Sequence, residues 1–271
     1  MAKKGEKILT RNRVGKLGLD KVSVITADML DGYTSIGDGA FYNCLNLTSI
    51  KIPNSVTNIG HNAFCNCSSL TSVTIGNSVT NIENRAFFNC RSLTSIMIPN
   101  SVTRIGYSAF EGCSMLISIE IPNSVTSIEA WSFHHCTGLT SVTISNSVTF
   151  IGYCVFDYCW NLTSVTIRDK IYKYQVIKDG KCKAYKAFNA DMTCRNFQYE
   201  EGKTYELKDD PKLCIYGFHA CLKLTDVFNY YAGKLGKGIV VYEVELEGVN
   251  YEKGGDSKVV AKKITIGKRI L

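Results

Sequence analysis

The sequence predicts a solenoid of stacked coils, each with a short parallel strand and a short helical segment, followed by a small α+β domain. Six cysteines recur every 23 residues from Cys44 to Cys159, and a phenylalanine and a leucine recur at the same spacing. The pattern stops at residue 168, where strand-like runs of another kind begin. Such a period is typical of repeat proteins, whose stacked units together bury the apolar face that one unit cannot cover alone.

The repeat is regular enough to fix its own boundaries. Blocks of 23 residues align six copies without an insertion, so we expect the solenoid to span residues 34–168. Coils one to six begin at Thr34, Thr57, Thr80, Thr103, Thr126 and Thr149. The apolar positions shared by all copies are Phe41, Phe64, Phe87, Phe110, Phe133 and Phe156; Cys44, Cys67, Cys90, Cys113, Cys136 and Cys159; and Leu47, Leu70, Leu93, Leu116, Leu139 and Leu162.

Each copy combines two hydrophobic periods. Residues 47–52 alternate from Ile50 onward, as a short half-buried strand does. Residues 36–44 place an alanine, a phenylalanine and a cysteine on one face of a short helical segment. Pro53 and the two residues after it supply a turn. We therefore expect a parallel sheet along one side of the solenoid and helical segments along another.

The segment before the first copy resembles a terminal repeat. Residues 24–33 fit the strand half of a copy, with Tyr33 at the position where the next copy has Val56. Terminal repeats are atypical because they must seal an open end of the core. We expect residues 17–33 to form an N-terminal cap and residues 1–16 to be a loose basic arm.

The repeated frame L-x-x-[IV]-x-I-P-x-S-V-T-x-I-G-x-x-A-F-x-x-C resembles the BspA-like class of leucine-rich repeats over residues 34–168. This resemblance implies a right-handed leucine-rich-repeat solenoid. It also implies a role in protein recognition or adhesion, and it brings no catalytic residues.

The six aligned cysteines are expected to form a column inside the solenoid. Adjacent strands lie about 4.8 Å apart, which is within the Cα separation of about 4.4–6.8 Å found in disulfides. Pairing would, however, pull the side chains out of the register that the other rows require. Free cysteine packs as a small apolar group. We therefore expect packing rather than disulfides or a metal site, and we expect Cys65 and Cys154, which lie off the column, to be exposed.

Charge and hydropathy argue against two classes of partner. The formal net charge is +7, but residues 34–168 hold five Lys/Arg and six Asp/Glu, so the excess lies in the two ends. These ends mix both signs, whereas a nucleic-acid binder usually has a clustered basic face. The basic start of the chain is not followed by the apolar run of a secretory signal, and no stretch approaches the ~18 apolar residues of a membrane helix. We expect a cytoplasmic protein without membrane insertion and without nucleic acid.

Variation between copies locates the free surface. The strand face carries small hydroxyl side chains, interrupted by Lys51, Met97 and Glu120. The helical side differs more, because coils four to six gather aromatic rings there, and such rings are enriched in binding hot spots. These rings either form a contact surface or fold back onto the solenoid. If they form a contact surface, either the C-terminal domain or a foreign protein covers it. The candidate binding residues are Tyr107, Trp131, His134, His135, Tyr153, Tyr158 and Trp160.

Residues 169–271 are expected to form the separate α+β domain. Residues 183–188, 240–246 and 259–266 show strand character. Residues 225–231 resemble a short helix with Thr225 as its N-cap. The segments 186–195, 217–221 and 226–231 resemble an uncharacterised domain family of bacterial and phage proteins, which covers residues 183–271 and implies no known activity.

A fainter resemblance of this domain is to ADP-ribosyltransferase-like folds. It would make the domain an enzyme or a nucleotide-binding unit, with a pocket containing His219, Tyr230 and Tyr231. His219 also has two other interpretations, as a buried histidine bonded to the backbone or as a zinc ligand beside Cys214 and Cys221. The spacing of these residues matches no common zinc pattern. We expect neither a metal ion nor a cofactor.

The function that the sequence favours is a non-catalytic scaffold. It would bind a protein partner through the solenoid surface, because stacked coils offer a long rigid surface that loses little entropy on binding. The C-terminal domain would cap the solenoid. The alternative is a C-terminal enzyme or nucleotide-binding unit that is carried by a structural solenoid.

Overall fold

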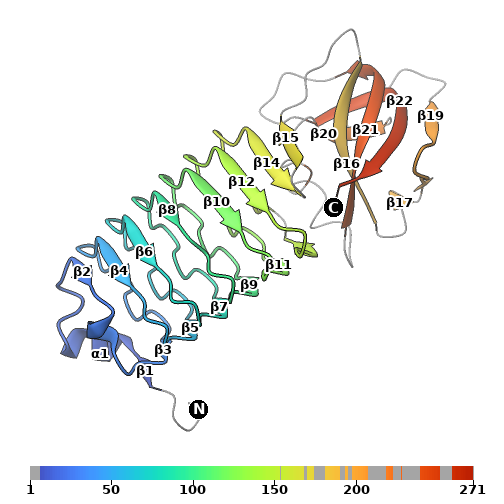
Figure 1. The fold of residues 1–271 in the computed structure, drawn as a ribbon. Coiled ribbons are helices and arrows are strands. Elements are labelled where there is room, and N and C mark those ends of the chain that lie inside the picture. Colours follow the sequence, from blue (N-terminus) through green and yellow to red (C-terminus); the bar gives the residue numbers. More distant parts are fainter. Residues whose placement is uncertain are drawn as a thin grey trace. The chain divides into compact units, whose positions relative to one another are not determined.

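The computed structural model divides into two compact units, residues 1–168 and residues 169–271. It describes residues 7–152, 154–167, 170–173, 181–189, 193–194, 197–206, 218–221, 227, 239–250 and 258–270. The predicted fold class is confirmed for the first unit, which is a solenoid of stacked coils built from short parallel strands (Figure 1).

Two ladders of parallel strands run along two sides of the solenoid (Figure 1). The first is a seven-stranded sheet of β1 Ile8–Leu9, β3 Ser35–Ile36, β5 Asn58–Ile59, β7 Asn81–Ile82, β9 Arg104–Ile105, β11 Ser127–Ile128 and β13 Phe150–Ile151. The second has two parts. One part contains β2 Val24–Ile25, β4 Ser49–Lys51, β6 Ser72–Thr74 and β8 Ser95–Ile96, and the other contains β10 Ser118–Ile121, β12 Ser141–Ile144 and β14 Ser164–Ile167. The register advances by one copy at each step, because Ser72 pairs with Ser95 and Ser118 pairs with Ser141.

The N-terminal end of the solenoid contains a strand and a short helix within residues 8–16. Strand β1 pairs with β3, and helix α1, Arg11–Lys16, buries Val14 completely. Thr10 caps this helix by accepting a hydrogen bond from the backbone N–H of Arg13. The prediction of a loose arm over residues 1–16 is therefore wrong for residues 8–16. The charged residues of this segment suggested an exposed arm, but its apolar side chains Leu9 and Val14 are buried in the core.

The segments between the two ladders are turns rather than the expected short helices. In each of the six coils, successive i→i+3 hydrogen bonds form after the strand of the first ladder, such as Ala40 N–H to the Gly37 carbonyl. Two positions in every coil have positive φ, which a right-handed helix does not allow. In coil one these positions are Gly39 and Asn43, with φ of 58° and 57°.

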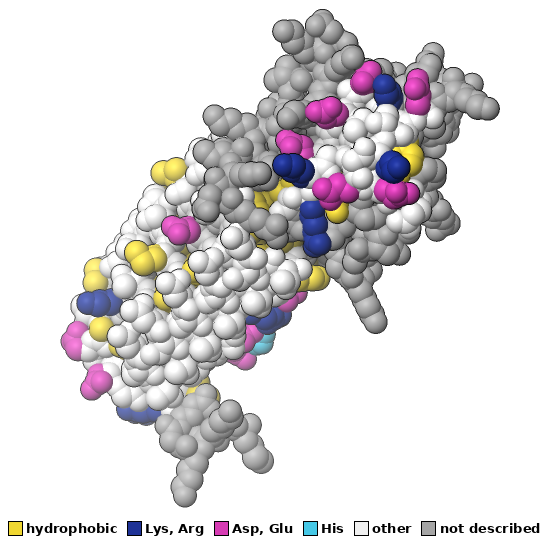
Figure 2. Space-filling model, turned by 45° about the vertical axis from the view of Figure 1, so that its right-hand side comes forward, with side chains coloured by type: hydrophobic (Ala, Val, Ile, Leu, Met, Phe, Trp, Pro, Cys, Tyr) yellow, Lys and Arg dark blue, Asp and Glu magenta, His cyan; other side chains and the backbone are white. Residues whose placement is uncertain are grey.

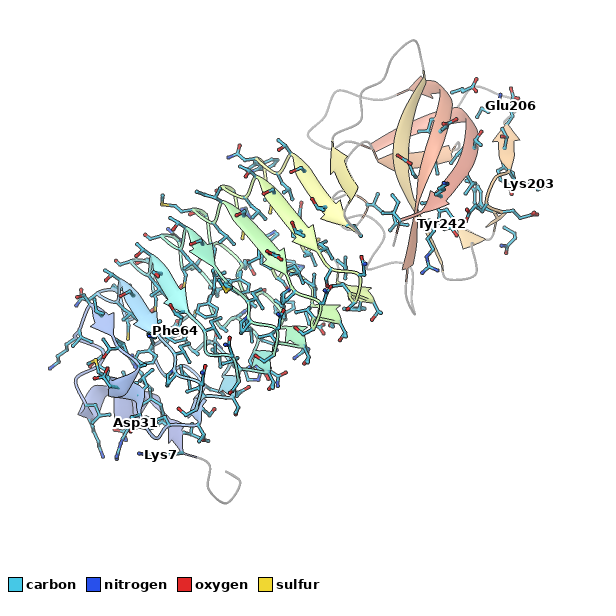
Figure 3. All side chains as sticks on the ribbon, viewed as in Figure 1. Lys7, Asp31, Phe64, Lys203, Glu206 and Tyr242 are labelled. Atoms are coloured by element: carbon cyan, nitrogen blue, oxygen red, sulfur yellow. The ribbon has the colours of Figure 1, made fainter. Side chains whose placement is uncertain are left out.

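The core of the solenoid is a stack of phenylalanine rings. Neighbouring rings from Phe41 to Phe156 lie with their centroids 5.2 to 5.6 Å apart and their planes within 9° of parallel. Phe64, labelled in Figure 3, is completely buried, as are its neighbours Phe41 and Phe87. Because each ring packs on the rings of the adjacent coils, the stack links the coils in series.

The cysteine column contains free, buried thiols, as predicted. Each thiol from coil two onward donates a hydrogen bond to the phenylalanine carbonyl of the preceding coil, at Sγ···O distances of 3.0 to 3.3 Å. Cys44 has no such coil before it, and the Arg11 guanidinium lies 3.1 Å from its Sγ instead. The prediction that Cys65 is exposed is wrong. Its side chain is 5% exposed, and it occupies the row of the repeat in which the adjacent coils carry the larger Tyr42 and Phe88.

The second unit contains a five-stranded, mainly antiparallel sheet with the order β19-β22-β20-β16-β21. The three runs expected to be strands lie within β16, β21 and β22, and Val227, in the region of the expected helix, is helical and buried. Tyr242 of β21, labelled in Figure 3, is buried. The strands of this unit are β15 Lys170–Lys173, β16 Lys181–Asn189, β17 Thr193–Cys194, β18 Phe197–Gln198, β19 Thr204–Glu206, β20 Phe218–Cys221, β21 Ile239–Asn250 and β22 Lys258–Arg269.

Candidate functional site

Six of the seven candidate binding residues form one continuous series of ring contacts, which we call the aromatic patch: Tyr107, Trp131, His134, His135, Tyr158 and Trp160. Tyr107 lies 6.3 Å from Trp131, and Trp131 lies 4.6 Å from His134, measured between ring centroids. His134 contacts His135 and Tyr158 edge-on, at 4.3 and 5.3 Å. The series ends with Trp160, which lies 5.2 Å from Tyr158. The seventh candidate, Tyr153, lies outside the described residues.

His134 is at the centre of the patch and is held between two carboxylates. It stands in the same position of the repeat as Glu111 in the coil before and Asp157 in the coil after. Its Nδ1 lies 3.3 Å from Oε1 of Glu111, and its Nε2 lies 4.0 Å from Oδ2 of Asp157. The imidazole is buried, with 7% of its residue surface exposed. His134 therefore fixes the spacing of the rings around it, while the outer residues of the patch form its accessible surface.

The accessible residues of the patch are His135, Tyr158 and Trp160. Tyr158 is 42% exposed and Trp160 is 62% exposed, and His135 is also exposed. The rings of His135 and Tyr158 stack with an interplanar angle of 5° and a centroid distance of 4.4 Å. Large rings exposed in a contiguous group usually indicate a contact surface.

The backbone of the patch is strained. The two positive-φ positions of each coil hold glycine or asparagine in coil one, as the left-handed conformation favours. In coils five and six they hold Trp131, His135, Cys154 and Tyr158, with φ between 52° and 62°. A bulky residue in this conformation costs about 1–2 kcal/mol. Strained residues of this kind cluster at functional sites.

The candidate pocket of the second unit is not described. His219 belongs to β20 and pairs with Val260 of β22, but its side chain is not described. Tyr230 and Tyr231 lie outside the described residues altogether. In the part of the chain that the structure describes, no group of three or more His, Cys, Asp or Glu residues is arranged to hold a metal ion.

Comparison with protein families identifies both units. The model of the BspA-type leucine-rich repeat region matches residues 34–163 and 108–179, which together cover more than half of the chain. The chain belongs to this family. BspA-type leucine-rich repeat proteins are commonly protein-binding or surface-associated. Residues 182–271 match DUF7666, a domain of unknown function. No curated protein matches the chain.

Solved leucine-rich repeat proteins from bacteria are similar to the chain. One from T. pallidum is 26% identical and has a TM-score of 0.44, and the match covers 52% of this chain and 78% of that protein. One from Bacteroides ovatus is 32% identical with a TM-score of 0.42, covering 49% and 40%. A leucine-rich cell surface protein from Faecalibacterium prausnitzii is 34% identical with a TM-score of 0.39, covering 56% and 46%. The match thus spans less than half of the length of the last two proteins.

The second ladder of strands divides in one place, at residues that the sequence alone did not mark as a site. No strand pairing joins β8 to β10, and a pocket lined by Met97, Pro99 and Glu120 lies at this gap. Met97 is 82% exposed. A signal was present in the sequence, because Ile117 replaces a threonine that the other five coils carry. In coil two this threonine, Thr71, donates its hydroxyl to the Thr48 carbonyl.

On the face of the solenoid that Figure 2 shows, uncharged polar side chains and backbone cover most of the surface. Within the described residues, no helix is both long enough and apolar enough to cross a membrane.

Proposed function

We propose that this chain is a non-catalytic scaffold that binds a protein partner through the aromatic patch. The observation that carries the proposal is the presence of His135 and Tyr158 at a strained position that holds asparagine or glycine in the four preceding coils. Trp131 stands at the other strained position of coil five. The strain destabilises the folded chain, so stability alone does not favour these rings. A binding role would account for them.

The packing beneath the patch suits it for binding. His134, at the centre of the patch, is buried, and its Nδ1 lies 3.3 Å from Oε1 of Glu111. Rings held in place before binding lose little conformational entropy when a partner covers them. Tyrosine and tryptophan also provide large contact areas with few rotatable bonds. These properties favour the aromatic patch over the strand face, whose side chains are mostly serine and threonine.

We further propose that the segment after residue 168 caps the open end of the solenoid. Coil six ends in apolar residues of the core, including Phe156 and Leu162, and a bare edge of parallel strands would aggregate. A chain that ends at Asp169 is therefore expected to be poorly soluble. Purification of residues 1–169 as a stable monomer would exclude a capping role.

The binding proposal can be tested with variants that the repeat itself supplies. Tyr158→Asn places the residue of Asn89 at the equivalent position, and Trp160→Thr places that of Thr137. Both replacements occur naturally in other coils, so both variants are expected to fold. Partners captured from the native host by the wild-type chain should be lost with either variant.

A matched control separates binding from general surface hydrophobicity. Phe150 is also in coil six and is 45% exposed, but it lies in β13 outside the aromatic patch. Phe150→Ser, which copies Ser127, should retain the partner. If Phe150→Ser loses the partner as completely as Trp160→Thr, the patch is not the binding site. If Trp160→Thr instead makes residues 169–271 more sensitive to limited proteolysis, the patch is a docking site for that unit, and the proposal fails.

A further inference from the structure

The gap between β8 and β10 contains a pocket of about 770 Å³. Strands β10, β12 and β14 each have four residues, whereas β8 ends at Ile96, so Met97 follows the strand directly. No pairing joins β8 to β10 in the part of the chain that the structure describes. The volume falls within the range of about 300–1,000 Å³ that is typical of ligand sites.

The pocket carries a negative charge. Among the described residues that line it, Glu120 is the one charged residue. Its carboxylate forms no hydrogen bond and no ion pair with any other residue that the structure describes. Residues 105–167 contain no lysine or arginine, and the nearest lysine in the row of Glu120 is Lys51, three coils away. The pocket would therefore repel an anion, whereas a cation would meet an opposite charge that the protein leaves unpaired.

The walls of the pocket suit an aliphatic stem better than a flat ring or a guanidinium. They include Pro99, Pro122 and Met97, whose surface is 82% exposed. No aromatic residue is among the described residues that line the pocket. A guanidinium gains from stacking on aromatic faces, whereas an ammonium group is a compact charge on a four-carbon stem that packs along apolar surface. The pocket therefore favours lysine over arginine.

Two amide side chains at the pocket can bond to the main chain that carries such a lysine. Asn77 and Asn100 line the pocket, and both residues are exposed. Neither side chain forms a hydrogen bond with another residue that the structure describes. An amide side chain offers both donors and an acceptor, as a peptide group requires. A lysine within a polypeptide therefore fits the pocket better than a free amine does.

We propose that the pocket between β8 and β10 is a second binding site, which takes a lysine side chain of another protein. Glu120 pairs with the ammonium group, and Met97 and the prolines contact the stem. The amides of Asn77 and Asn100 bond to the main chain of the ligand. This inference goes beyond the proposed function and does not depend on it, because the residues that line the pocket are not those of the aromatic patch.

The test uses the full chain, with its methionine methyl groups labelled with ¹³C, and a defined probe. The methyl signal of Met97 is followed by NMR while Nα-acetyl-lysine methylamide, which mimics one lysine of a peptide, is added. The signal should shift saturably, and binding should weaken as salt is raised. The signal of Met29, which is 37% exposed in the N-terminal cap, should not shift.

Three further ligands and two variants isolate the features that the pocket recognises. The Nε-acetylated probe, which has no charge, should produce no saturable shift. Nα-acetyl-arginine methylamide and n-butylamine should each bind more weakly than the lysine probe. Glu120→Gln should weaken lysine binding by roughly threefold or more. Asp28→Asn, which removes an exposed carboxylate outside the pocket, should leave it unchanged.

Three results would overturn the inference outright: no shift at Met97, an equal shift with the acetylated probe, or unchanged affinity in Glu120→Gln. Arginine binding at least as tightly as lysine would overturn the choice of side chain, and n-butylamine binding at least as tightly would make a free amine the ligand. Failure here is distinguishable from failure of the proposed function. Trp160→Thr alters the aromatic patch and should leave lysine binding unchanged, so a loss in that variant would place the probe at the patch and reject the second site.

Discussion

The thiol of Cys90 donates a hydrogen bond to the carbonyl oxygen of Phe64, with Sγ 3.2 Å from the oxygen. The same carbonyl accepts a second bond from the backbone N–H of Cys67, at 3.2 Å, within its own coil. One buried oxygen therefore joins a turn of one coil to the side chain of the next. The cysteine row is thus more than apolar packing, because its thiols are also donors between coils.

This relationship predicts an unusual order of stabilities at position 90. Cys90→Ala removes the donor and leaves a small cavity, so it should lower the free energy of unfolding by about 1–2 kcal/mol. Cys90→Ser keeps a donor at the same place and should cost less than Cys90→Ala. Urea denaturation of the three proteins measures both differences. If serine is the more damaging replacement, the row is held by apolar packing alone.

The buried thiols also predict sensitivity to alkaline pH. Burial raises the pKa of Cys113 to about 12, and those of Cys67 and Cys159 to about the same value. In the unfolded chain a thiol titrates near pH ~8.5. Between these two values the unfolded state has lost protons that the folded state keeps. The free energy of unfolding should therefore be unaffected by these groups below pH ~8 and fall above it, by about 1.4 kcal/mol per pH unit for each thiol.

Denaturation at pH 7, 9 and 10 checks this dependence, with Cys113→Ala as the comparison. Removing one titrating thiol should make the alkaline decline shallower by about 1.4 kcal/mol per pH unit. Lysines also titrate in this range, but they do so equally in both proteins. Identical slopes for the wild type and Cys113→Ala would contradict the assignment of Cys113 as a neutral buried thiol.

The phenylalanine stack predicts a large difference between two adjacent residues. Phe87→Ala removes a completely buried ring from the middle of the stack and should cost about 3–5 kcal/mol. Phe88→Ala removes a ring of the same size that is only half-buried, and it should cost less than half as much. Thermal or urea unfolding compares them directly. Equal costs would mean that the stack does not carry the stability of the core.

The gap between β8 and β10 predicts a stabilising substitution. Ile117 is 56% exposed. At the equivalent position of the next coil, the hydroxyl of Thr140 donates a hydrogen bond to a carbonyl of the preceding coil, that of Ile117, at 3.0 Å. Ile117 has no hydroxyl and cannot make the equivalent bond. The backbone N–H of Ile117 already donates to the Thr94 carbonyl. Ile117→Thr should add a hydroxyl bond to the same carbonyl and raise the free energy of unfolding by about 0.5 kcal/mol. A loss of more than about 1 kcal/mol would show instead that Ile117 packs against the solenoid.

Most of the solenoid could be predicted from the sequence because the same apolar residues recur at the same positions of every coil. Each phenylalanine faces the same neighbours six times, so the period of 23 residues determines the stacking and the parallel register together. The ring contacts of the aromatic patch were also predictable from coil stacking, except for Tyr153, which lies outside the described residues. The carboxylates beside His134 could have been found in the same way, since Glu111 and Asp157 occupy its row.

Three features were not predictable by that reasoning. The helical periodicity of residues 36–44 was misleading, because positive φ at two positions converts the segment into turns. Asparagine and glycine at those positions were a signal for this backbone. The order of residues 8–16 depends on contacts with coil one, such as that of Arg11 with Cys44, which no local pattern reveals. The separation of β8 from β10 coincides with Ile117, the one residue of its row that is not threonine.

The central claim, that the aromatic patch binds a protein partner, is tested most directly by hydrogen exchange on the complex. The partner captured by the wild-type chain is purified, and amide exchange of the chain is compared with and without it. Protection should appear over residues 130–135 and 154–161, which carry the patch, and should disappear with Trp160→Thr. Protection confined to the strand face at residues 95–98 and 118–121, with residues 130–135 and 154–161 unchanged, would contradict the account.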